Sequence, residues 1–455
     1  CSATGTAYNR NTATYTDYKH LWCNLFNTNK LARCHSSEVR MIVRVSRFLL
    51  TGALVLLTAG PSAAQFRPGG EVVFDNGRSA VGIPFELNSD KIYLHVKLND
   101  SGPYWLVLDT GSPGMILDTG VAKELGISTG EKFPVGAAGE NPFTLAPADS
   151  TFDAFVPGMM LLDQPAHVGA INAIVGPYEG RRIDGVLGGY NVFAKYIVEV
   201  DYDAQTIGVY ERGYYTEREG GTTIPVEVFR GHCVIEATSI LADGDTLAGE
   251  FMLDTGLRGT MVFNTPFVNE HDLLDRFSPT IYTTVGGGLG GQVKARVGRL
   301  QDFIFGGISL GGIHASLSQI IRGAFANPDR AGIIGSAVLQ RFLVVFDYAG
   351  ERLTLYEQDY DPDRLDFDKS GTFLVSDVDD LSVYRVIDVV EGSPAEEAGL
   401  EVDDVIREID GKPAAQLSLE AVRRLYRGQA GTTFSIVYKR DDQLHTTKLT
   451  LRKVI

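Results

Sequence analysis

The amino-acid sequence predicts a mostly β fold with two similar lobes from an internal duplication, followed by a small α+β domain. The first observation is a run of three apolar residues followed by Asp-Thr-Gly, which occurs at 106–111 and again at 251–256. The second is that further segments match in the same order between the two halves, which indicates duplication rather than coincidence. The third is a new pattern of strands and short helices after residue 370.

The first 64 residues are predicted to lie outside this fold. Residues 1–40 show no periodicity, and we interpret them as translated upstream sequence. Residues 41–64 are typical of a secretory signal peptide, because Arg44 and Arg47 precede a short apolar run and a small-residue site ends at Ala64. An uncleaved anchor is the alternative, but about twelve apolar residues are too few to span a bilayer. We therefore expect an exported bacterial protein, periplasmic or secreted, with no stable membrane anchor after signal cleavage.

The composition argues against anionic partners. The chain has 41 Lys and Arg against 57 Asp and Glu, a formal net charge of −16. Without residues 1–64, 34 basic and 55 acidic residues remain, a net charge of −21. Such a chain is poorly suited to bind phosphate backbones, so no nucleic-acid partner is expected. Cys233 is the one cysteine that remains, so the fold must depend on a large core rather than on disulfides.

The repeat can be followed along the chain. Residues 65–82 are Gly-rich and polar and predict a loosely held N-terminal arm. In each half an alternating strand turns back into the Asp-Thr-Gly strand, which makes that strand the second arm of a hairpin. We expect one lobe over residues 83–211 and the other over residues 222–357, with a charged joint between them. Later segments also match, including Val186–Gly188 with Ile333–Gly335.

Each copy of the motif delivers one carboxylate at the end of a buried strand. The apolar run is typical of the strand, and Thr-Gly of the tight loop that leaves it. If the two loops face each other, Asp109 and Asp254 share one site, where two like charges about 3 Å apart cannot both ionise. One carboxyl then acts as an acid and the other as a base. Such a pair can activate a water against a peptide carbonyl.

The two loops differ at the residue after glycine. Ser112 is placed to donate a hydrogen bond to Asp109, whereas Leu257 offers nothing similar to Asp254. We therefore expect Asp109 to be the more often ionised carboxyl, although the titration belongs to the pair.

The doubled motif, followed in each half by the apolar-apolar-Gly segment, resembles the aspartic peptidases, and the short lobes resemble the retropepsin-like branch. The resemblance covers residues 83–357 and implies a double β-barrel that hydrolyses protein or peptide substrates without a cofactor or metal. Asp109 and Asp254 would be the catalytic pair. Thr110 and Thr255 would join the two loops by hydrogen bonds. The residues implied as support for the catalytic loops are Thr110, Gly111, Ser112, Thr255 and Gly256, and those implied as flap or substrate positions are Gly136, Gly139, Gly286 and Gly288.

Residues 370–455 resemble a PDZ domain of the bacterial type. The resemblance rests on Gly392–Ala395, Ala398–Leu400 and Ile409–Gly411. It implies a domain that adds an extended peptide ligand to a sheet edge and often captures a terminal carboxylate. The loop for that carboxylate would fall at Ser370–Phe373, but acidic residues close by do not favour it. Whether the domain presents substrate or restrains the active site stays open.

Other motifs are interpreted as structural. A third Asp-Thr-Gly begins at Asp118, but it precedes a helical pattern and has no counterpart in the second half, so Asp118 is predicted to cap a helix. Ser128 and Ser309 fit the spelling of a serine-hydrolase elbow without its strand and helix. The histidines lack the spacing of metal ligands.

Together these patterns favour an exported aspartic endopeptidase with a PDZ domain for peptide binding or regulation. The alternative is a non-catalytic exported peptide-binding protein that retains the same fold. Leu257 and the Ser112-Pro113 pair favour the alternative slightly, whereas two intact Asp-Thr-Gly loops favour the enzyme.

Overall fold

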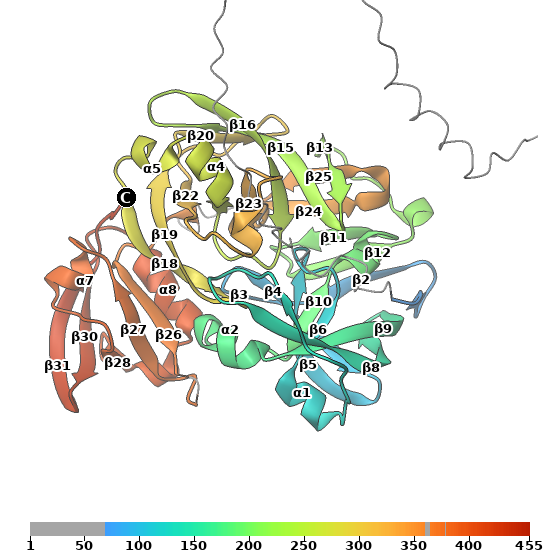
Figure 1. The fold of residues 1–455 in the computed structure, drawn as a ribbon, viewed down its shortest axis with the longest axis horizontal. Coiled ribbons are helices and arrows are strands. Elements are labelled where there is room, and N and C mark those ends of the chain that lie inside the picture. Colours follow the sequence, from blue (N-terminus) through green and yellow to red (C-terminus); the bar gives the residue numbers. More distant parts are fainter. Residues whose placement is uncertain (1–68, 360–364, 378) are drawn as a thin grey trace, which may run out of the picture. The chain divides into compact units, whose positions relative to one another are not determined.

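The computed structural model describes residues 69–359, 365–377 and 379–455, which form a mostly β protein (Figure 1). The segments interpreted as upstream sequence (1–40) and as a signal peptide (41–64) lie outside the described residues. All described residues belong to one compact unit. No helix within these ranges is long and apolar enough to cross a membrane.

The first half of the repeat builds a nine-stranded sheet. Its strands are β1 (Val72–Phe74), β3 (Glu86–Asn88), β4 (Lys91–Leu98), β5 (Ser101–Asp109), β6 (Met115–Asp118), β7 (Phe133–Val135), β8 (Phe143–Val156), β9 (Met159–Gly169) and β10 (Gly185–Gly188). Hydrogen-bonded neighbours follow the order β1-β9-β6-β10-β5-β4-β8-β7, and β3 pairs with β4. The helices of this half are α1 (Thr119–Glu124), α2 (Ile171–Glu179) and α3 (Tyr190–Phe193). As expected, the Asp-Thr-Gly strand β5 is the second arm of a hairpin with β4.

The second half builds a ten-stranded sheet in the same way. Its strands are β14 (Glu227–Phe229), β15 (His232–Ile240), β16 (Thr246–Asp254), β17 (Met261–Phe263), β18 (Ile281–Gly288), β19 (Gly291–Arg299), β20 (Asp302–Phe305), β21 (Ile308–Ser309), β22 (His314–Leu317) and β23 (Gly332–Gly335). Its helices are α4 (Thr265–Glu270), α5 (Leu273–Arg276), the 3-10 helix η3 (Ala324–Ala326) and α6 (Ser336–Leu339). Here β15 and β16 form the hairpin that ends at the second motif.

The two halves place their motifs identically. β10 runs parallel to β5 with Gly188 beside Asp109, and β23 runs parallel to β16 with Gly335 beside Asp254. Both glycines press against the motif loops: a Cβ on either would lie 2.4 Å from loop backbone atoms. Only glycine allows this approach, and the repeated geometry confirms the predicted duplication.

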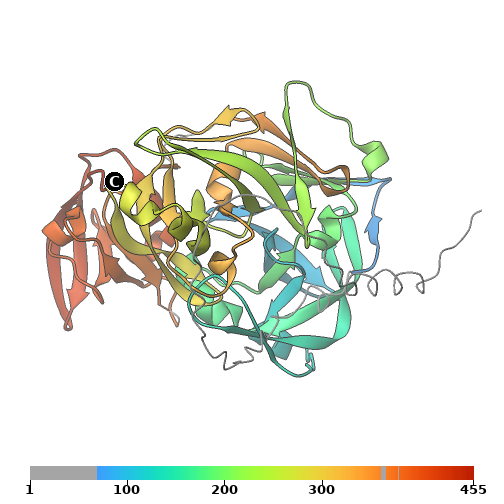
Figure 2. The ribbon, with the colours of Figure 1, turned by 45° about the horizontal axis from the view of Figure 1, so that its top comes forward.

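A third sheet combines strands from both halves. Its strands are β2 (Ser79–Pro84), β11 (Ile197–Asp201), β12 (Thr206–Tyr210), β13 (Thr222–Pro225), β24 (Phe342–Asp347) and β25 (Arg352–Glu357), with the short 3-10 helices η2 (Arg212–Tyr214) and η4 (Tyr348–Gly350) nearby in sequence. The order is β13-β25-β24-β11-β12-β2, so β11 of the first half pairs with β24 of the second. In Figure 2, blue, green and orange segments lie side by side in this sheet.

The N-terminal arm is more ordered than its composition predicted. The loosely held arm expected over residues 65–82 contains β1, which pairs with β9, and most of β2, which pairs with β12. The prediction was wrong because apolar side chains in this Gly-rich stretch find partners far along the chain. Phe74 packs edge-on against Tyr196 at 5.6 Å between ring centroids, and Ala80 is buried.

The C-terminal domain has its own sheet and its own hydrophobic core. Its elements are β26 (Thr372–Ser376), β27 (Tyr384–Val389), α7 (Pro394–Glu397), β28 (Val405–Ile409), β29 (Lys412–Pro413), the 3-10 helix η6 (Ala414–Gln416), α8 (Leu419–Arg427), β30 (Thr433–Arg440) and β31 (Gln443–Thr450). The sheet order is β26-β27-β28-β30-β31, which leaves β26 at an edge. Val386, Ile436 and Val422 of α8 are fully buried in this core.

Candidate active site

The two Asp-Thr-Gly loops face each other. Asp109 ends β5 and Asp254 ends β16, and their carboxyl groups share a hydrogen bond. The amides of Gly111 and Gly256 each donate to the Oδ1 atom of the aspartate in their own loop, at 2.7 Å. A Cβ on Gly111 would lie 2.6 Å from Oδ2 of Asp254, and one on Gly256 would lie 2.4 Å from Cγ of Asp109. The two glycines therefore permit the contact between the carboxyl groups.

Two threonines hold the loops together through four hydrogen bonds. The amide of Thr110 donates to Oγ1 of Thr255 at 3.1 Å, and the amide of Thr255 donates to Oγ1 of Thr110 at 3.0 Å. Each hydroxyl then donates to the opposite strand, Thr110 to the carbonyl of Leu253 at 2.9 Å and Thr255 to that of Leu108 at 2.8 Å. Both threonines are buried. The cross-lobe bonds implied by the resemblance are therefore present.

Burial and mutual repulsion keep a proton on the carboxyl pair. Burial, followed by the adjacent Asp254 carboxyl, raises the pKa of Asp109 to about 8. Burial also raises the pKa of Asp254, although the amide of Gly256 and the hydrogen bond with Asp109 oppose this rise. The raised pKa favours the protonated form of Asp109 at neutral pH, and two carboxyl groups this close together cannot both be ionised.

Ser112 does not have the expected partner. Its hydroxyl donates to the carbonyl of Gly114 at 3.0 Å instead of to Asp109. The expectation that Asp109 is the more often ionised carboxyl was wrong for this reason, because burial and the charge of Asp254 act on it without that donor. Ser112 still lines the cavity that holds the pair.

A cavity of about 800 Å³ contains both carboxyl groups. The expected flap residues that line it are Gly136, Gly286 and Gly288. Gly139 instead pairs with Gly290, at the tip of the β18–β19 hairpin, where the amide of Gly290 donates to the carbonyl of Ala138 at 2.7 Å. The two flap segments expected from the sequence thus meet each other and enclose the site.

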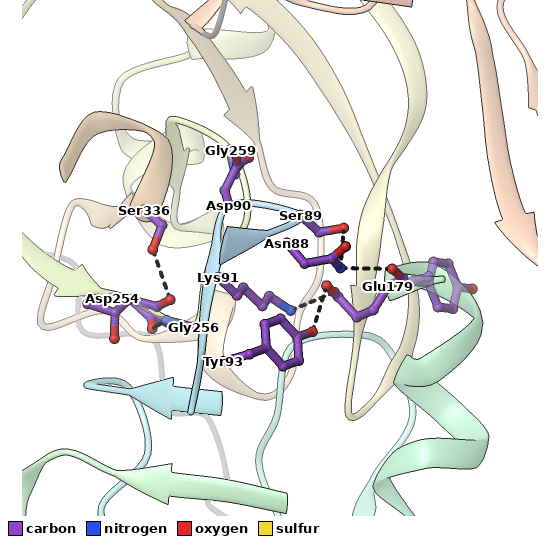
Figure 3. A network of polar contacts seen from close by, with 12 residues as sticks. Asn88, Ser89, Asp90, Lys91, Tyr93, Glu179, Asp254, Gly256, Gly259 and Ser336 are labelled. Atoms are coloured by element: carbon purple, nitrogen blue, oxygen red, sulfur yellow. Dashed lines mark hydrogen bonds and ion pairs between the residues drawn. The ribbon is translucent and has the colours of Figure 1, made fainter. Parts of the chain in front are cut away.

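A buried ion pair joins Lys91 at the start of β4 to Glu179 at the end of α2 (Figure 3). Nζ of Lys91 lies 2.8 Å from Oε1 of Glu179, and the Tyr93 hydroxyl donates to Oε2 of Glu179 at 3.1 Å. Lys91 and Glu179 line the cavity and are only 8% and 2% exposed. Against the larger effect of burial, the charge of Lys91 lowers the pKa of both Asp109 and Asp254. Sequence reasoning missed this pair, and no local pattern signals it, because its members are 88 residues apart.

Two family models match the chain. The aspartyl protease model matches residues 94–190, which include the first Asp-Thr-Gly loop, and the PDZ domain model matches residues 385–440. The chain is aspartyl-protease-like and carries a PDZ domain.

Curated relatives match the chain over short stretches. A probable CtpA-like serine protease of Staphylococcus haemolyticus is 37% identical over 65 residues, 14% of this chain and 13% of that protein. A carboxyl-terminal-processing protease of Picosynechococcus is 38% identical over 73 residues, 16% of this chain and 18% of that protein. The chain thus covers less than a fifth of the length of each relative. Among solved structures, an aspartic proteinase from Irpex lacteus covers 62% of this chain and 98% of its own length, with 13% identity and a TM-score of 0.39.

The motifs set aside in the sequence have structural partners. Asp118 caps α1 by accepting from the amide of Gly120 at 2.7 Å, as predicted. Ser309 is exposed and donates to Oδ2 of Asp302 at 2.7 Å. Neither Asp118 nor Ser309 lines the cavity of the carboxyl pair, and Ser128 does not line it either.

The PDZ domain forms one wall of the cavity through β26 and α8. The link to the carboxyl pair is the two-residue turn between β3 and β4, in which Ser89 and Asp90 both have positive φ, as such hairpin turns require. Nη1 of Arg423 in α8 donates to Oγ of Ser89 at 2.7 Å. Asp90 accepts from the amide of Gly259, in the second motif loop, at 3.2 Å. The turn between β3 and β4 therefore contacts both the PDZ domain, through Ser89, and the loop that follows Asp254, through Asp90.

The PDZ loop at Ser370–Phe373, where a terminal carboxylate would bind, already holds the carboxylate of Asp368. The carboxylate of Asp368 accepts from the amides of Ser370 and Gly371, at 2.8 and 2.9 Å, and from the hydroxyl of Ser370 at 2.5 Å. This is the loop at which a terminal carboxylate was considered. An internal carboxylate takes the donors that such a ligand would need.

The PDZ domain also holds the flap hairpin of the second lobe. Asp388 on β27 accepts from the amide of Thr284 at 2.5 Å, from Oγ1 of Thr283 at 3.1 Å and from Nζ of Lys294 at 3.2 Å. These three donors belong to β18 and β19. The sequence had left open whether the domain presents substrate or restrains the site, and these contacts support restraint.

Replacing Asp388 with Ala is expected to loosen this hairpin. Hydrogen bonds to a charged group contribute about 1.5–3 kcal/mol each, so amide-exchange protection over residues 281–299 should fall by about tenfold or more. Exchange measured by mass spectrometry checks this. The matched control is Asp377→Ala, which removes a PDZ carboxylate paired with Arg385 at 3.6 Å. Equal protection in both variants and the wild type would show that Asp388 does not restrain the hairpin.

Proposed function

We propose that the chain is an aspartic endopeptidase that hydrolyses peptide bonds with a water activated between Asp109 and Asp254. The observation that carries the proposal is that the two carboxyl groups share one hydrogen bond inside a cavity enclosed by both lobes. The aspartyl protease model over residues 94–190 supports it.

In the proposed reaction the pair acts with one proton. The ionised Asp254 takes a proton from the water as its oxygen bonds to the peptide carbonyl carbon, and Asp109 gives its proton to the carbonyl oxygen. The C–N bond then breaks, and the proton held by Asp254 passes to the leaving nitrogen. A hydroxyl proton of the intermediate returns to Asp109 as the new carboxylic acid forms. No covalent intermediate with the chain is involved.

The activity should depend on pH in a way that the pair determines. Casein hydrolysis is expected to be fastest between the raised pKa of Asp254 and the pKa of about 8 of Asp109, because the pair then carries one proton. Above about pH 8 the rate should fall as the shared proton is lost. The measurement is kcat/KM for casein-derived peptides from pH 3 to pH 10, with and without pepstatin. Hydrolysis that pepstatin leaves unchanged would contradict an aspartic mechanism.

A serine mechanism is the competing proposal, because one curated relative is named as a probable serine protease and the other as a carboxyl-terminal-processing protease. Ser112 lines the cavity, but its hydroxyl donates to a backbone carbonyl rather than to a base. Labelling by a fluorophosphonate probe would favour the serine mechanism. Peptide binding without hydrolysis under any condition would favour a non-catalytic peptide-binding protein.

Export is a separate part of the proposal and rests on the signal-peptide pattern at residues 41–64. N-terminal sequencing of the protein recovered from a bacterial periplasm or medium tests it, with Gln65 as the expected first residue.

A further inference from the structure

Two arginines flank one aromatic ring in the wall of the catalytic cavity. Arg258 follows the second Asp-Thr-Gly loop, and Arg423 lies on α8 of the PDZ domain. Their guanidinium carbons lie 5.5 and 5.8 Å from the ring centroid of Phe373 on β26. All three residues line the cavity that contains Asp109 and Asp254.

Neither guanidinium has a carboxylate partner. Arg423 is 6% exposed and donates only to neutral acceptors: Oγ of Ser89 at 2.7 Å, the carbonyl of Tyr178 at 2.6 Å and the carbonyl of Leu374 at 3.3 Å. Nη1 of Arg258 is buried and has no hydrogen-bond partner. Among the described residues, no carboxylate lies within salt-bridge distance of either arginine, although against the effect of burial the charges of Arg427 and Arg258 lower the pKa of Asp90. A buried donor without an acceptor costs about 1–3 kcal/mol, and more when it is charged.

The acidic groups around the two arginines are engaged elsewhere. The pairs are Glu179 with Lys91, Asp366 with Arg299 and Lys369, Glu420 with Arg427, Asp368 with the amides of Ser370 and Gly371, and Asp90 with the amide of Gly259. Burial, followed by the charge of Arg258, lowers the pKa of Arg423 to about 9, although Glu420 and Glu179 oppose this at longer range. The two guanidinium groups therefore act on each other in the cavity wall without a carboxylate bound between them.

We propose that Arg258 and Arg423 form a binding site for a carboxylate of the bound peptide, on the PDZ side of the catalytic pair. This inference rests on the proposed function, since it names a substrate feature of the same cavity. A guanidinium presents its N–H groups in a planar fork that matches a carboxylate, and desolvation strengthens the contact. The carboxylate comes from an Asp or Glu side chain or from the peptide C-terminus. The PDZ amide loop does not compete for it, because Asp368 fills that loop.

Binding to a variant without turnover tests the site separately from hydrolysis. The probes are three pools of N-acetylated decapeptides: one with a fixed central Glu and an amidated C-terminus, one with Gln in its place, and one with Gln and a free C-terminal carboxylate. Affinities are measured with the full chain carrying Asp254→Asn. We expect the pool with the recognised carboxylate to bind about tenfold more tightly than the Gln amide pool, because a charged hydrogen bond contributes about 1.5–3 kcal/mol. Tighter binding of the Glu pool would show that the site recognises an acidic side chain, and tighter binding of the pool with a free C-terminus would show that it recognises the terminal carboxylate.

The Arg258→Gln variant should lose this preference, and Arg258→Lys should keep part of it. The matched control is Arg296→Gln, since Arg296 also has a buried unpartnered nitrogen but does not line the cavity. Equal affinity for all three pools, or a preference that survives Arg258→Gln, would overturn the inference. If Arg258→Gln does not fold, the test uses Arg258→Lys and added salt. The inference then predicts a reduced preference in the Lys variant and a wild-type preference that weakens as salt is added, and a preference unchanged by both would overturn it. A carboxylate preference in a protein that does not hydrolyse peptides under any condition would contradict the proposed peptidase function but would support this binding site.

Discussion

Replacing Asp109 with Asn is expected to lower kcat/KM by about 10³-fold or more, because the variant loses a proton donor and changes the ionisation of Asp254. Asp254→Asn should have an effect of the same size. The measurement is steady-state hydrolysis of a casein-derived peptide near pH 6. The matched control is Asp118→Asn, in the third Asp-Thr-Gly, which should keep its activity because asparagine also caps helices. If Asp109→Asn were as active as Asp118→Asn, the assignment of Asp109 and Asp254 as the catalytic pair would be wrong.

The same variant should change stability in a pH-dependent way. The pKa of Asp109 is raised on folding from 3.8 to about 8, so its proton stabilises the folded state below pH 3.8. This contribution is lost as the pH rises through about 8. Asp109→Asn is therefore expected to be more stable than the wild type at pH 9, by about 2 kcal/mol or more, and to show no such gain at pH 4. Calorimetric unfolding at both pH values provides the measurement.

Replacing Thr110 with Val is expected to destabilise the protein by about 2–5 kcal/mol, because the amide of Thr255 and the carbonyl of Leu253 then lie buried without their partner. Hydrolysis should fall as well, since the loops would no longer hold the carboxyl groups at a fixed distance. Chemical unfolding and kcat/KM are measured on the same preparations.

The conservative variant Thr110→Ser keeps the hydroxyl and serves as the control. It should lie within about 1 kcal/mol of the wild type and retain most of its activity. A Val variant as stable as the Ser variant would mean that the cross-lobe hydrogen bonds of the Thr110 hydroxyl do not determine the stability of the loops.

The features that the sequence predicted are those encoded by neighbouring residues. An apolar run followed by Asp-Thr-Gly is local, and its repetition in register allowed the hairpins to be expected. The threonine contacts and the packing of the apolar-Gly segments against the loops were implied by the resemblance to the aspartic peptidases. The small C-terminal domain was recognisable from turn and helix signals that lie within a few residues of each other.

The features that were missed depend on contacts between distant segments. Arg423 and Ser89 are 334 residues apart, and only the packed structure brings them together. The ordered arm was missed because β1 and β2 gain their partners late in the chain. For Ser112 the sequence shows that a hydroxyl donor is present but does not determine its rotamer, and in the structure the hydroxyl donates to the carbonyl of Gly114 instead of to Asp109.

The sheet that combines β11 with β24 bears on how such a chain arose. An ancestor with a single half would have one carboxyl, one threonine hydroxyl and an unpaired edge on β11, so it would function only after meeting a second copy. Fusion of the two halves makes that encounter intramolecular and independent of protein concentration. It also releases the halves from identical sequences, and only the second has acquired the three donors that Asp388 holds.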